Sequence, residues 1–395
     1  MFINSQFTCL WLAQTLSQIA TNTLVFFIGF FIYKKTTSNI AVSLTLLAFL
    51  IPSFLSSILA GVTVSRMGKK WVLFLSNIFR ALIVFLMFFA EKNFFCLYIL
   101  MFFLALTAQF FAPAESSIIP QVVPKDKLIT ANAYFSTTGN LALIVGVLLS
   151  PILFKLFAYK TLFFILFMFL GAAASIYFLR LEEPLFYTNF KQSVNGLAKK
   201  FHYHLSFIIG NFVKDKKINQ NVFYIILFQV TIFILITLAP GFADKILRVP
   251  IEDLSFLIIF PTTIGFIMAA FVIRWFKKIK EKVLIKRSFL GISLIFLAIF
   301  LTSQLKTRAF LNLLNFFLLA IFGFLSELVV VTAYANLQKE TKVGERAGYF
   351  GLLNAFISIT SIIPVLLSGV LSDMFGVDKI VLLLALVFLG LVVKN

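Results

Sequence analysis

The sequence predicts an all-α membrane protein with twelve transmembrane helices in two pseudo-symmetric six-helix bundles. Of its 395 residues, 61% are hydrophobic and 12% are charged, whereas soluble proteins have about 45–50% apolar and about 25% charged residues. At about 20 residues per transmembrane helix, this apolar content is enough for roughly twelve spans. Only 18 glycines and 10 prolines occur, which excludes collagen-like and disordered chains.

Twelve apolar segments lie between clusters of charged and polar residues. In order, we expect spans at residues 8–32, 40–64, 71–90, 94–119, 131–157, 160–180, 220–242, 252–275, 285–304, 309–337, 347–373 and 378–393. Helices satisfy their backbone polar groups within the segment, as lipid requires, and the segments lack the alternation of barrel strands. The predicted domains are an N-terminal bundle (1–180), a cytoplasmic linker (181–219) and a C-terminal bundle (220–395).

The distribution of Lys and Arg predicts the orientation of the spans. With both termini in the cytoplasm, the cytoplasmic loops hold more than twice as many basic residues as the outer loops, which agrees with the positive-inside rule. The net charge of +19 therefore reflects membrane topology, and we expect no nucleic-acid partner. We expect a monomer in the plasma or inner membrane, surrounded by the lipid bilayer.

Two matches between the halves of the chain predict an internal duplication. Pro52 precedes Arg66, Lys69 and Lys70 after the second span, and Pro261 precedes Arg274, Lys277 and Lys278 after the eighth, so the basic triplets are 208 residues apart. Tyr134 and Phe135 open the fifth span, with Pro151 later in it, as Tyr349, Phe350 and Pro364 do in the eleventh. Many secondary transporters consist of such repeats, which move against each other around a central cavity.

Five prolines lie within predicted spans: Pro52, Pro113, Pro151, Pro261 and Pro364. A proline bends a helix and frees a backbone carbonyl, which lipid tolerates only where protein or a cavity covers it. The prolines therefore indicate helix kinks, although membrane helices are richer in proline in general.

Three ionisable residues lie well inside the spans, and intramembrane charges often mark functional sites. We expect Arg80 to pair with Glu115, or Arg66 to do so nearer the cytoplasm, with either a gating role or a purely neutralising one. Glu327 has no basic neighbour in sequence and is the best candidate for a proton carrier. The alternative interpretation is that Glu327 is a structural carboxylate, paired with Arg346 or with another cytoplasmic cation.

The first span carries Gln14, Gln18, Thr21 and Asn22 at helical spacing, so these side chains form one polar stripe. Such a stripe faces protein or water and not lipid. It indicates either a cavity wall or hydrogen bonding between helices.

The loop after the second span carries the strongest motif, Gly61-Val62-Thr63-Val64-Ser65-Arg66-Met67-Gly68-Lys69-Lys70. It resembles the Gly-x-x-x-Asp-Arg-x-Gly-Arg-Arg/Lys signature of the major facilitator superfamily. Gly61, Ser65, Arg66, Gly68, Lys69 and Lys70 would then form the gating loop of that family. Ser65 departs from the pattern, in which this position is usually aspartate. Serine can cap a helix but carries no charge, so the departure implies a cytoplasmic latch that is either weaker or supplied by other residues.

Two further segments support the resemblance. Phe111-Ala112-Pro113-Ala114-Glu115, with Ile119, Pro120, Leu128, Ala131 and Asn132, is similar to the macrolide-efflux-like and lysophospholipid-transporter-like branch, and Gly344 to Gly351 resembles the loop entering span eleven. The Gly-Pro motif of antiporters is poorly kept, since Gly146 and Pro151 stand five residues apart. In this family, spans one, four, seven and ten line the cavity, which implies a lining of Gln14, Gln18, Asn22, Gln109, Gln229, Asn312 and Asn315.

The resemblance implies a secondary transporter that exports lipophilic small molecules by alternating access, with protons as a candidate coupling ion. A lysophospholipid translocator is the first alternative, and a membrane enzyme or non-transporting receptor is the second. The 53 phenylalanines suit a bulky apolar ligand. The spans contain no catalytic Ser, His and Asp set and no metal cluster, and the chain has no phosphate-binding loop for ATP, so we expect no catalytic residues, metal or cofactor. His202 and His204 lie in the linker, and Cys9 and Cys96 match no metal or redox spacing.

Overall fold

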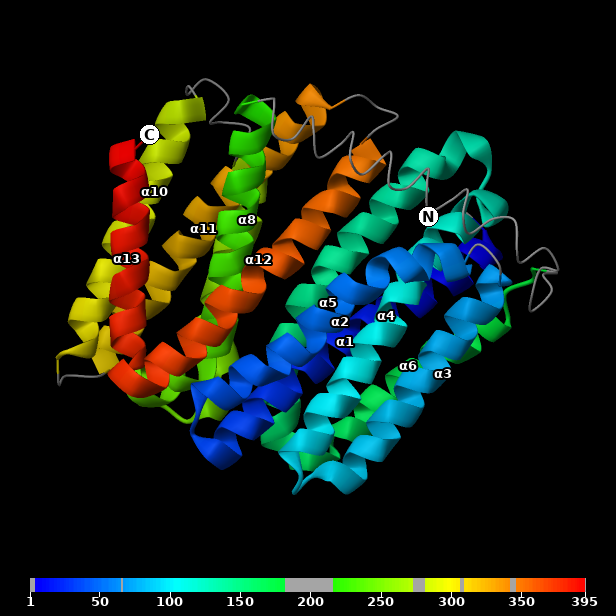
Figure 1. Ribbon diagram of the computed structural model, residues 1–395, viewed down its shortest axis with the longest axis horizontal. Coiled ribbons are helices and arrows are strands. Elements are labelled where there is room, and N and C mark those ends of the chain that lie inside the picture. Colours follow the sequence, from blue (N-terminus) through cyan, green and yellow to red (C-terminus); the bar gives the residue numbers. More distant parts are fainter. Residues whose placement is uncertain are drawn as a thin grey trace. The chain divides into compact units, whose positions relative to one another are not determined.

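The computed structural model describes residues 4–64, 67–181, 216–272, 281–305, 309–341 and 346–394, and these residues form helices without a β-strand (Figure 1). The first six α-helices are α1 (Ser5–Thr36), α2 (Asn39–Val64), α3 (Lys69–Met87), α4 (Phe94–Val122), α5 (Leu128–Phe157) and α6 (Thr161–Tyr177). Six more follow: α8 (Lys216–Gly241), α9 (Phe260–Val272), α10 (Glu281–Ser303), α11 (Ala309–Glu340), α12 (Arg346–Phe375) and α13 (Val377–Lys394). The predicted all-α fold is confirmed.

Nine segments of the described chain are long and apolar enough to cross a membrane. One of them, Thr130–Tyr177, covers both α5 and α6, and Asn39–Pro52 in α2 is a shorter apolar helix. The α13 helix is strongly apolar but carries three charged residues, Asp378, Lys379 and Lys394, within its 18 residues, and it is not among the nine. The chain is thus a multi-pass membrane protein, and the nine segments cover ten of the twelve expected spans by length and apolarity alone.

Prolines lie within several helices and beside both π-helical segments of the described chain. Pro52, Pro113, Pro151 and Pro364 lie inside helices, as expected. Pro261 is the second residue of α9 and follows a π-helical segment, η6 (Ser255–Ile259). Pro240, which the sequence analysis did not single out, precedes a second π-helical segment, η4 (Phe242–Leu247). Both π segments lie beside a proline that cannot donate a backbone hydrogen bond.

By its contacts the chain divides into two compact units. Unit 1 consists of Met1–Phe31 and Leu44–Tyr203, and unit 2 of Ile32–Ser43 and His204–Asn395. The boundary between Tyr203 and His204 falls within the predicted linker, and the connection between α1 and α2, expected in the N-terminal bundle, is grouped with unit 2.

Each unit repeats one packing pattern. In unit 1, α3 packs against α4 and α6, and in unit 2, α10 packs against α11 and α13 (Figure 1). These are the third, fourth and sixth helices of each half, so the equivalent pairs agree with the duplication inferred from the motifs. The core of unit 2 is apolar and rich in aromatic rings, with Phe228, Phe289 and Phe388 packed together.

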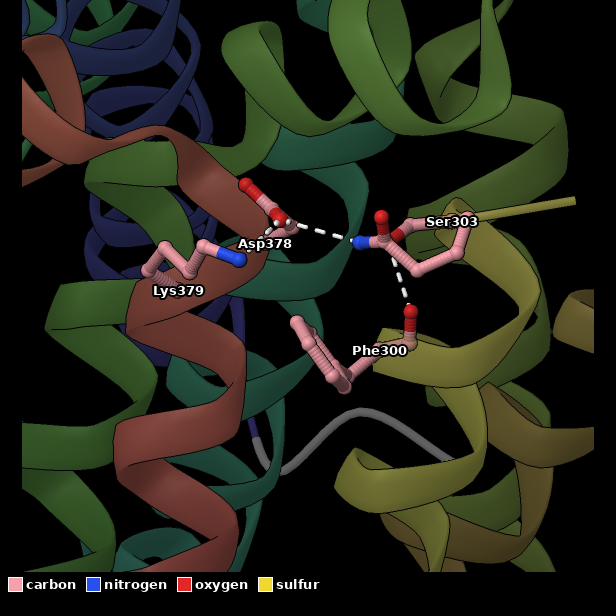
Figure 2. Close-up of polar contacts among 5 residues, drawn as sticks. Phe300, Ser303, Asp378 and Lys379 are labelled. Carbon is pink, nitrogen blue, oxygen red and sulfur yellow. Dashed lines mark hydrogen bonds and ion pairs between the residues drawn. The ribbon is translucent and has the colours of Figure 1, made fainter.

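The contact between α10 and α13 continues as polar bonds at one end of the pair. Figure 2 shows Asp378 and Lys379 at the start of α13, facing Ser303 and Phe300 at the end of α10. Gln304 Nε2 donates to Asp378 Oδ2 over 3.1 Å, and the Lys379 ammonium lies 5.2 Å from the centre of the Phe300 ring. Both helices belong wholly to unit 2.

Two glycines allow α9 and α11 to approach closely. A Cβ atom at Gly265 would lie 2.0 Å from the Ala320 carbonyl oxygen, and one at Gly323 would lie 2.1 Å from the Thr262 carbonyl oxygen. Small residues at such crossings let backbones touch, which is how helices gain packing energy in lipid. Any larger side chain at either position must push the helices apart.

We expect Gly323→Ala to lower the melting temperature of the detergent-purified protein, because the added methyl group overpacks the crossing at a cost of about 1–3 kcal/mol. The control is Gly390→Ala in α13, where a Cβ atom would meet nothing within 4 Å. A Gly323→Ala protein as stable as the Gly390→Ala protein would contradict this account of the crossing.

Candidate functional site

Arg80 is a buried cation in the interior of unit 1. Its side chain is 3% exposed, and Nη1 donates to Ser17 Oγ of α1 over 2.6 Å while Nη2 donates to the Thr107 carbonyl of α4 over 3.3 Å. The guanidinium lies 5.2 Å from the centre of the Phe111 ring and 5.9 Å from that of Phe169. Hydrogen bonds and ring faces together stabilise the charge away from water, and they link α3 to three other helices, α1, α4 and α6.

Glu115 is the buried carboxyl group of the same unit. It is 8% exposed, and Oε1 has no hydrogen-bond partner in the part of the chain that the structure describes. Its helix neighbours Phe111, Ala114, Ile118 and Ile119 belong to an apolar core cluster. A carboxyl oxygen without a donor in apolar surroundings is costly, and such groups cluster at functional sites.

The structure does not join Arg80 to Glu115. The guanidinium binds Ser17 and Thr107 and stacks on Phe111, which precedes Glu115 by one turn of α4. Each member keeps one unsatisfied buried atom, Arg80 Nε and Glu115 Oε1. The rival partner, Arg66, lies outside the described residues.

Glu327 lies in α11, four residues after the glycine crossing at Gly323. It is half-buried, and none of the ion pairs of the described residues includes it. Its neighbour Leu328 is fully buried against Phe324. The side chain of the proposed partner Arg346 lies outside the description.

The polar stripe of α1 makes hydrogen bonds between helices of unit 1. Gln14 is buried, with Nε2 donating to the Phe135 carbonyl of α5 over 3.2 Å and Oε1 accepting from Thr138 Oγ1 over 3.3 Å. About two helical turns later, Asn22 lies against Gly146, where an added Cβ atom would come within 2.6 Å of Asn22 Cβ. Gly146 thus permits the close approach of α1 and α5, whatever its place in an antiporter motif.

The other predicted lining residues divide into buried and half-buried ones. Asn315 is buried and accepts a hydrogen bond from Thr302 Oγ1 of α10 over 3.0 Å. Gln18, Asn22, Gln109, Gln229 and Asn312 are half-buried. Gln14 and Asn315 therefore connect helices within their units, whereas the half-buried residues are partly exposed.

The gating loop is described in part. Gly61 lies in the last turn of α2, Gly68 precedes α3, and Lys69 and Lys70 are the first two residues of α3. The Lys70 ammonium lies 5.9 Å from the centres of both the Trp71 and the Tyr177 rings. Ser65 and Arg66 lie outside the described residues.

Sequence reasoning missed the partners of Arg80. Ser17 lies on the same face of α1 as Gln14 and Thr21, so the polar stripe contained the signal. Thr107 contributes only its carbonyl, which no side-chain pattern reveals. Among the described residues, no three His, Cys, Asp or Glu side chains form a metal-binding group, and His202 and His204 lie outside them.

Comparison with known proteins assigns the family. Residues 10–365 match the profile of the Major Facilitator Superfamily, and the chain belongs to this superfamily. It is a membrane transporter and not an enzyme. No curated protein is similar enough in sequence to match.

Several solved structures share the fold. The nucleoside transporter NupG is similar with a TM-score of 0.75 at 12% identity, covering 98% of each chain. A POT family transporter in complex with a thioalcohol-conjugated peptide has a TM-score of 0.69 at 10% identity, covering 98% of this chain and 96% of the other. The POT family transporter PepTSo has a TM-score of 0.65 at 12% identity, covering 100% and 98%. At these identities the similarity shows the fold alone.

We expect Arg80→Lys to destabilise the protein by about 1–3 kcal/mol, because one ammonium cannot reproduce the two hydrogen bonds and the ring stacking of the guanidinium. Thermal unfolding in detergent measures the effect. The control is Arg180→Lys, since Arg180 is exposed. Equal melting temperatures for the two variants would show that the contacts of Arg80 contribute nothing.

Proposed function

We propose that the chain is a proton-coupled exporter of lipophilic small molecules that works by alternating access, in the macrolide-efflux-like and lysophospholipid-transporter-like branch of its superfamily. We place it in the plasma or inner membrane with both termini in the cytoplasm. Its partners would be the bilayer, protons and an apolar solute.

The observation that carries the coupling proposal is the unpartnered oxygen of Glu115. A carboxyl group in an apolar region interacts differently with its surroundings in its charged and neutral forms. Gain or loss of a proton therefore changes the relative stability of conformations that cover or expose the group. In this way a proton gradient can drive a conformational cycle.

Glu327 is the corresponding candidate in unit 2. It lies in α11, next to the crossing where Gly323 contacts the Thr262 backbone. When a carboxyl group beside a tightly packed helix crossing gains or loses a proton, the change in its charge can shift the position of one helix against the other. Two carboxyl groups, one in each unit, allow a proton to be bound on either half of the transporter.

The apolar character of the substrate rests on composition. The chain contains 53 phenylalanines, and the half-buried amides Gln18, Gln109, Gln229 and Asn312 are uncharged. Pockets with aromatic walls and a few polar groups suit bulky, weakly polar ligands. NupG and the POT transporters share the fold, but their nucleoside and peptide substrates are not carried over.

Transport by proteoliposomes under an imposed pH gradient tests the function. The panel contains ethidium as a lipophilic cation, a neutral hydrophobic dye, a fluorescent lysophospholipid, a nucleoside and a dipeptide. Gradient-dependent movement of the dyes supports the proposal. Movement of the lysophospholipid alone would support the lipid translocator, and movement of only the nucleoside or dipeptide would overturn the lipophilic substrate.

We expect Glu115→Gln or Glu327→Gln to reduce pH-gradient-driven transport at least about tenfold, because glutamine cannot exchange a proton, while exchange without a gradient continues. The control is Glu340→Gln, since Glu340 is already paired with Lys217 at the exposed end of α11. If both variants kept the full gradient dependence of the wild type, neither carboxyl group would be the proton carrier.

A further inference from the structure

A short segment between α1 and α2, Ile32–Ser43, belongs to unit 2. The two helices that continue from it, α1 and α2, have their other residues in unit 1. The segment lies at the predicted outer ends of both helices. Movement of these helices away from unit 2 must therefore break the contacts that the segment makes there.

The central contact joins Asp373 of α12 to the first residues of α2. Asp373 Oδ1 accepts from the Asn39 backbone amide over 2.9 Å and from Asn39 Nδ2 over 3.0 Å. Asp373 Oδ2 accepts from Ser38 Oγ over 2.6 Å and from the Ile40 amide over 3.1 Å. One carboxylate thus satisfies two of the amides that the start of a helix leaves unpaired.

Helix electrostatics favours this pairing. Asp373 lies two residues before the end of α12, where the negative end of its own helix dipole disfavours a carboxylate. The start of α2 presents the positive end of a dipole to the same group. The charge is therefore more stable when α2 is bound than when α2 is absent.

Two glycines bring the segment against unit 2. An added Cβ atom at Gly241 would lie 2.6 Å from Asn39 Oδ1, and one at Gly369 would lie 2.7 Å from Ser43 Oγ. Asn39 is fully buried, at 0% exposure. The two glycines therefore leave the space that the Asn39 and Ser43 side chains occupy.

Two further contacts flank the central one. Tyr33 donates to Asp244 Oδ2 over 3.2 Å, and Lys34 forms an ion pair with Glu252. We call the contacts of Asp373, Asp244 and Glu252 with the Ile32–Ser43 segment the outer clamp. Three acidic residues of unit 2 thus accept hydrogen bonds or ion pairs from donor groups of the Ile32–Ser43 segment.

The composition of the outer clamp distinguishes it from the cores of the units. The groups are hydroxyls, amides, carboxylates and an ammonium, which water can solvate once they separate. Thr37, in the same segment, has a φ of +51°, a conformation that is strained for a β-branched residue and persists only where neighbouring contacts hold it. Polar contacts and a strained backbone both lower the cost of separating the Ile32–Ser43 segment from its acidic partners.

We propose that the outer clamp is a conformational lock that closes and opens once in each transport cycle, with Asp373 as its central residue. When the clamp is closed, the Asp373 carboxylate caps α2. When it opens, water replaces the carboxylate at the amides of Asn39 and Ile40, and the segment detaches from unit 2.

Hydrogen exchange in nanodiscs tests the lock without a substrate. We expect Asp373→Ala to speed amide exchange in peptides that cover residues 38–44 at least about tenfold, because a hydrogen bond to a charged group contributes that much stability. The control is Asp378→Ala, which removes the same charge from the neighbouring helix. Unchanged exchange in the Asp373→Ala protein would overturn the proposal.

Cross-linking tests the requirement for opening. In a Cys9→Ser, Cys96→Ser background, Ser38→Cys with Asp373→Cys should form a disulfide that stops ethidium transport until dithiothreitol reduces it. The control pair is Gln304→Cys with Asp378→Cys, which replaces a contact inside unit 2 (Figure 2) and should cross-link without loss of transport.

The proposal would be overturned if the oxidised Ser38→Cys, Asp373→Cys protein transported ethidium as fast as the same protein after treatment with dithiothreitol. It would also be overturned if this pair failed to cross-link under conditions in which the control pair does. Because hydrogen exchange needs no transport, a wild-type protein that moves none of the tested solutes would refute the proposed function and leave the lock to be judged by exchange.

Discussion

The free energy of placing polar groups in lipid is the constraint on which the rest of this structure depends. It forces the backbone into helices that satisfy their own hydrogen bonds, and it requires each intramembrane charge to find local partners. Arg80 meets that requirement with a serine hydroxyl, a backbone carbonyl and two aromatic faces. Its Nε and Glu115 Oε1 both lack a hydrogen-bond partner among the described residues. Arg80 is nevertheless held by contacts with three other helices, which makes it a structural centre of unit 1.

Helix association in lipid gains little from the hydrophobic effect, so close approach and buried hydrogen bonds carry more of the packing. The α9–α11 crossing at Gly265 and Gly323 and the α1–α5 approach at Gly146 are contacts of the first kind. The bonds of Gln14 to α5 and of Thr302 to Asn315 are of the second. Both kinds occur inside the units, which suits bodies that keep their shape while a transporter changes conformation.

The sequence was sufficient for the fold but not for the site. Composition and the charged residues between apolar segments predicted the helices because lipid leaves few alternatives. The repeated motifs predicted the duplication with which the equivalent packing of α3 and α10 agrees. The hydrogen-bond partners of Arg80 were not predicted, because a carbonyl such as that of Thr107 carries no sequence signal. The guanidinium stacks on Phe111, which lies one turn of α4 before the expected partner Glu115. Asp373 drew no attention, because an acidic residue at the end of a span reads as loop and only the fold shows that it faces the start of α2.

The polar residues of unit 2 separate into permanent and releasable sets by what surrounds them. Thr302 and Asn315 bond within a buried layer between two helices of the same unit, where separation would expose the apolar core around Phe296 and Phe322 to lipid or water. The donors on Asp373 come from a segment whose helices continue into unit 1, and their separation exposes groups that water solvates well. Similar hydrogen bonds therefore have opposite roles: the first kind preserves a bundle, and the second allows two conformations of comparable stability, which alternating access requires.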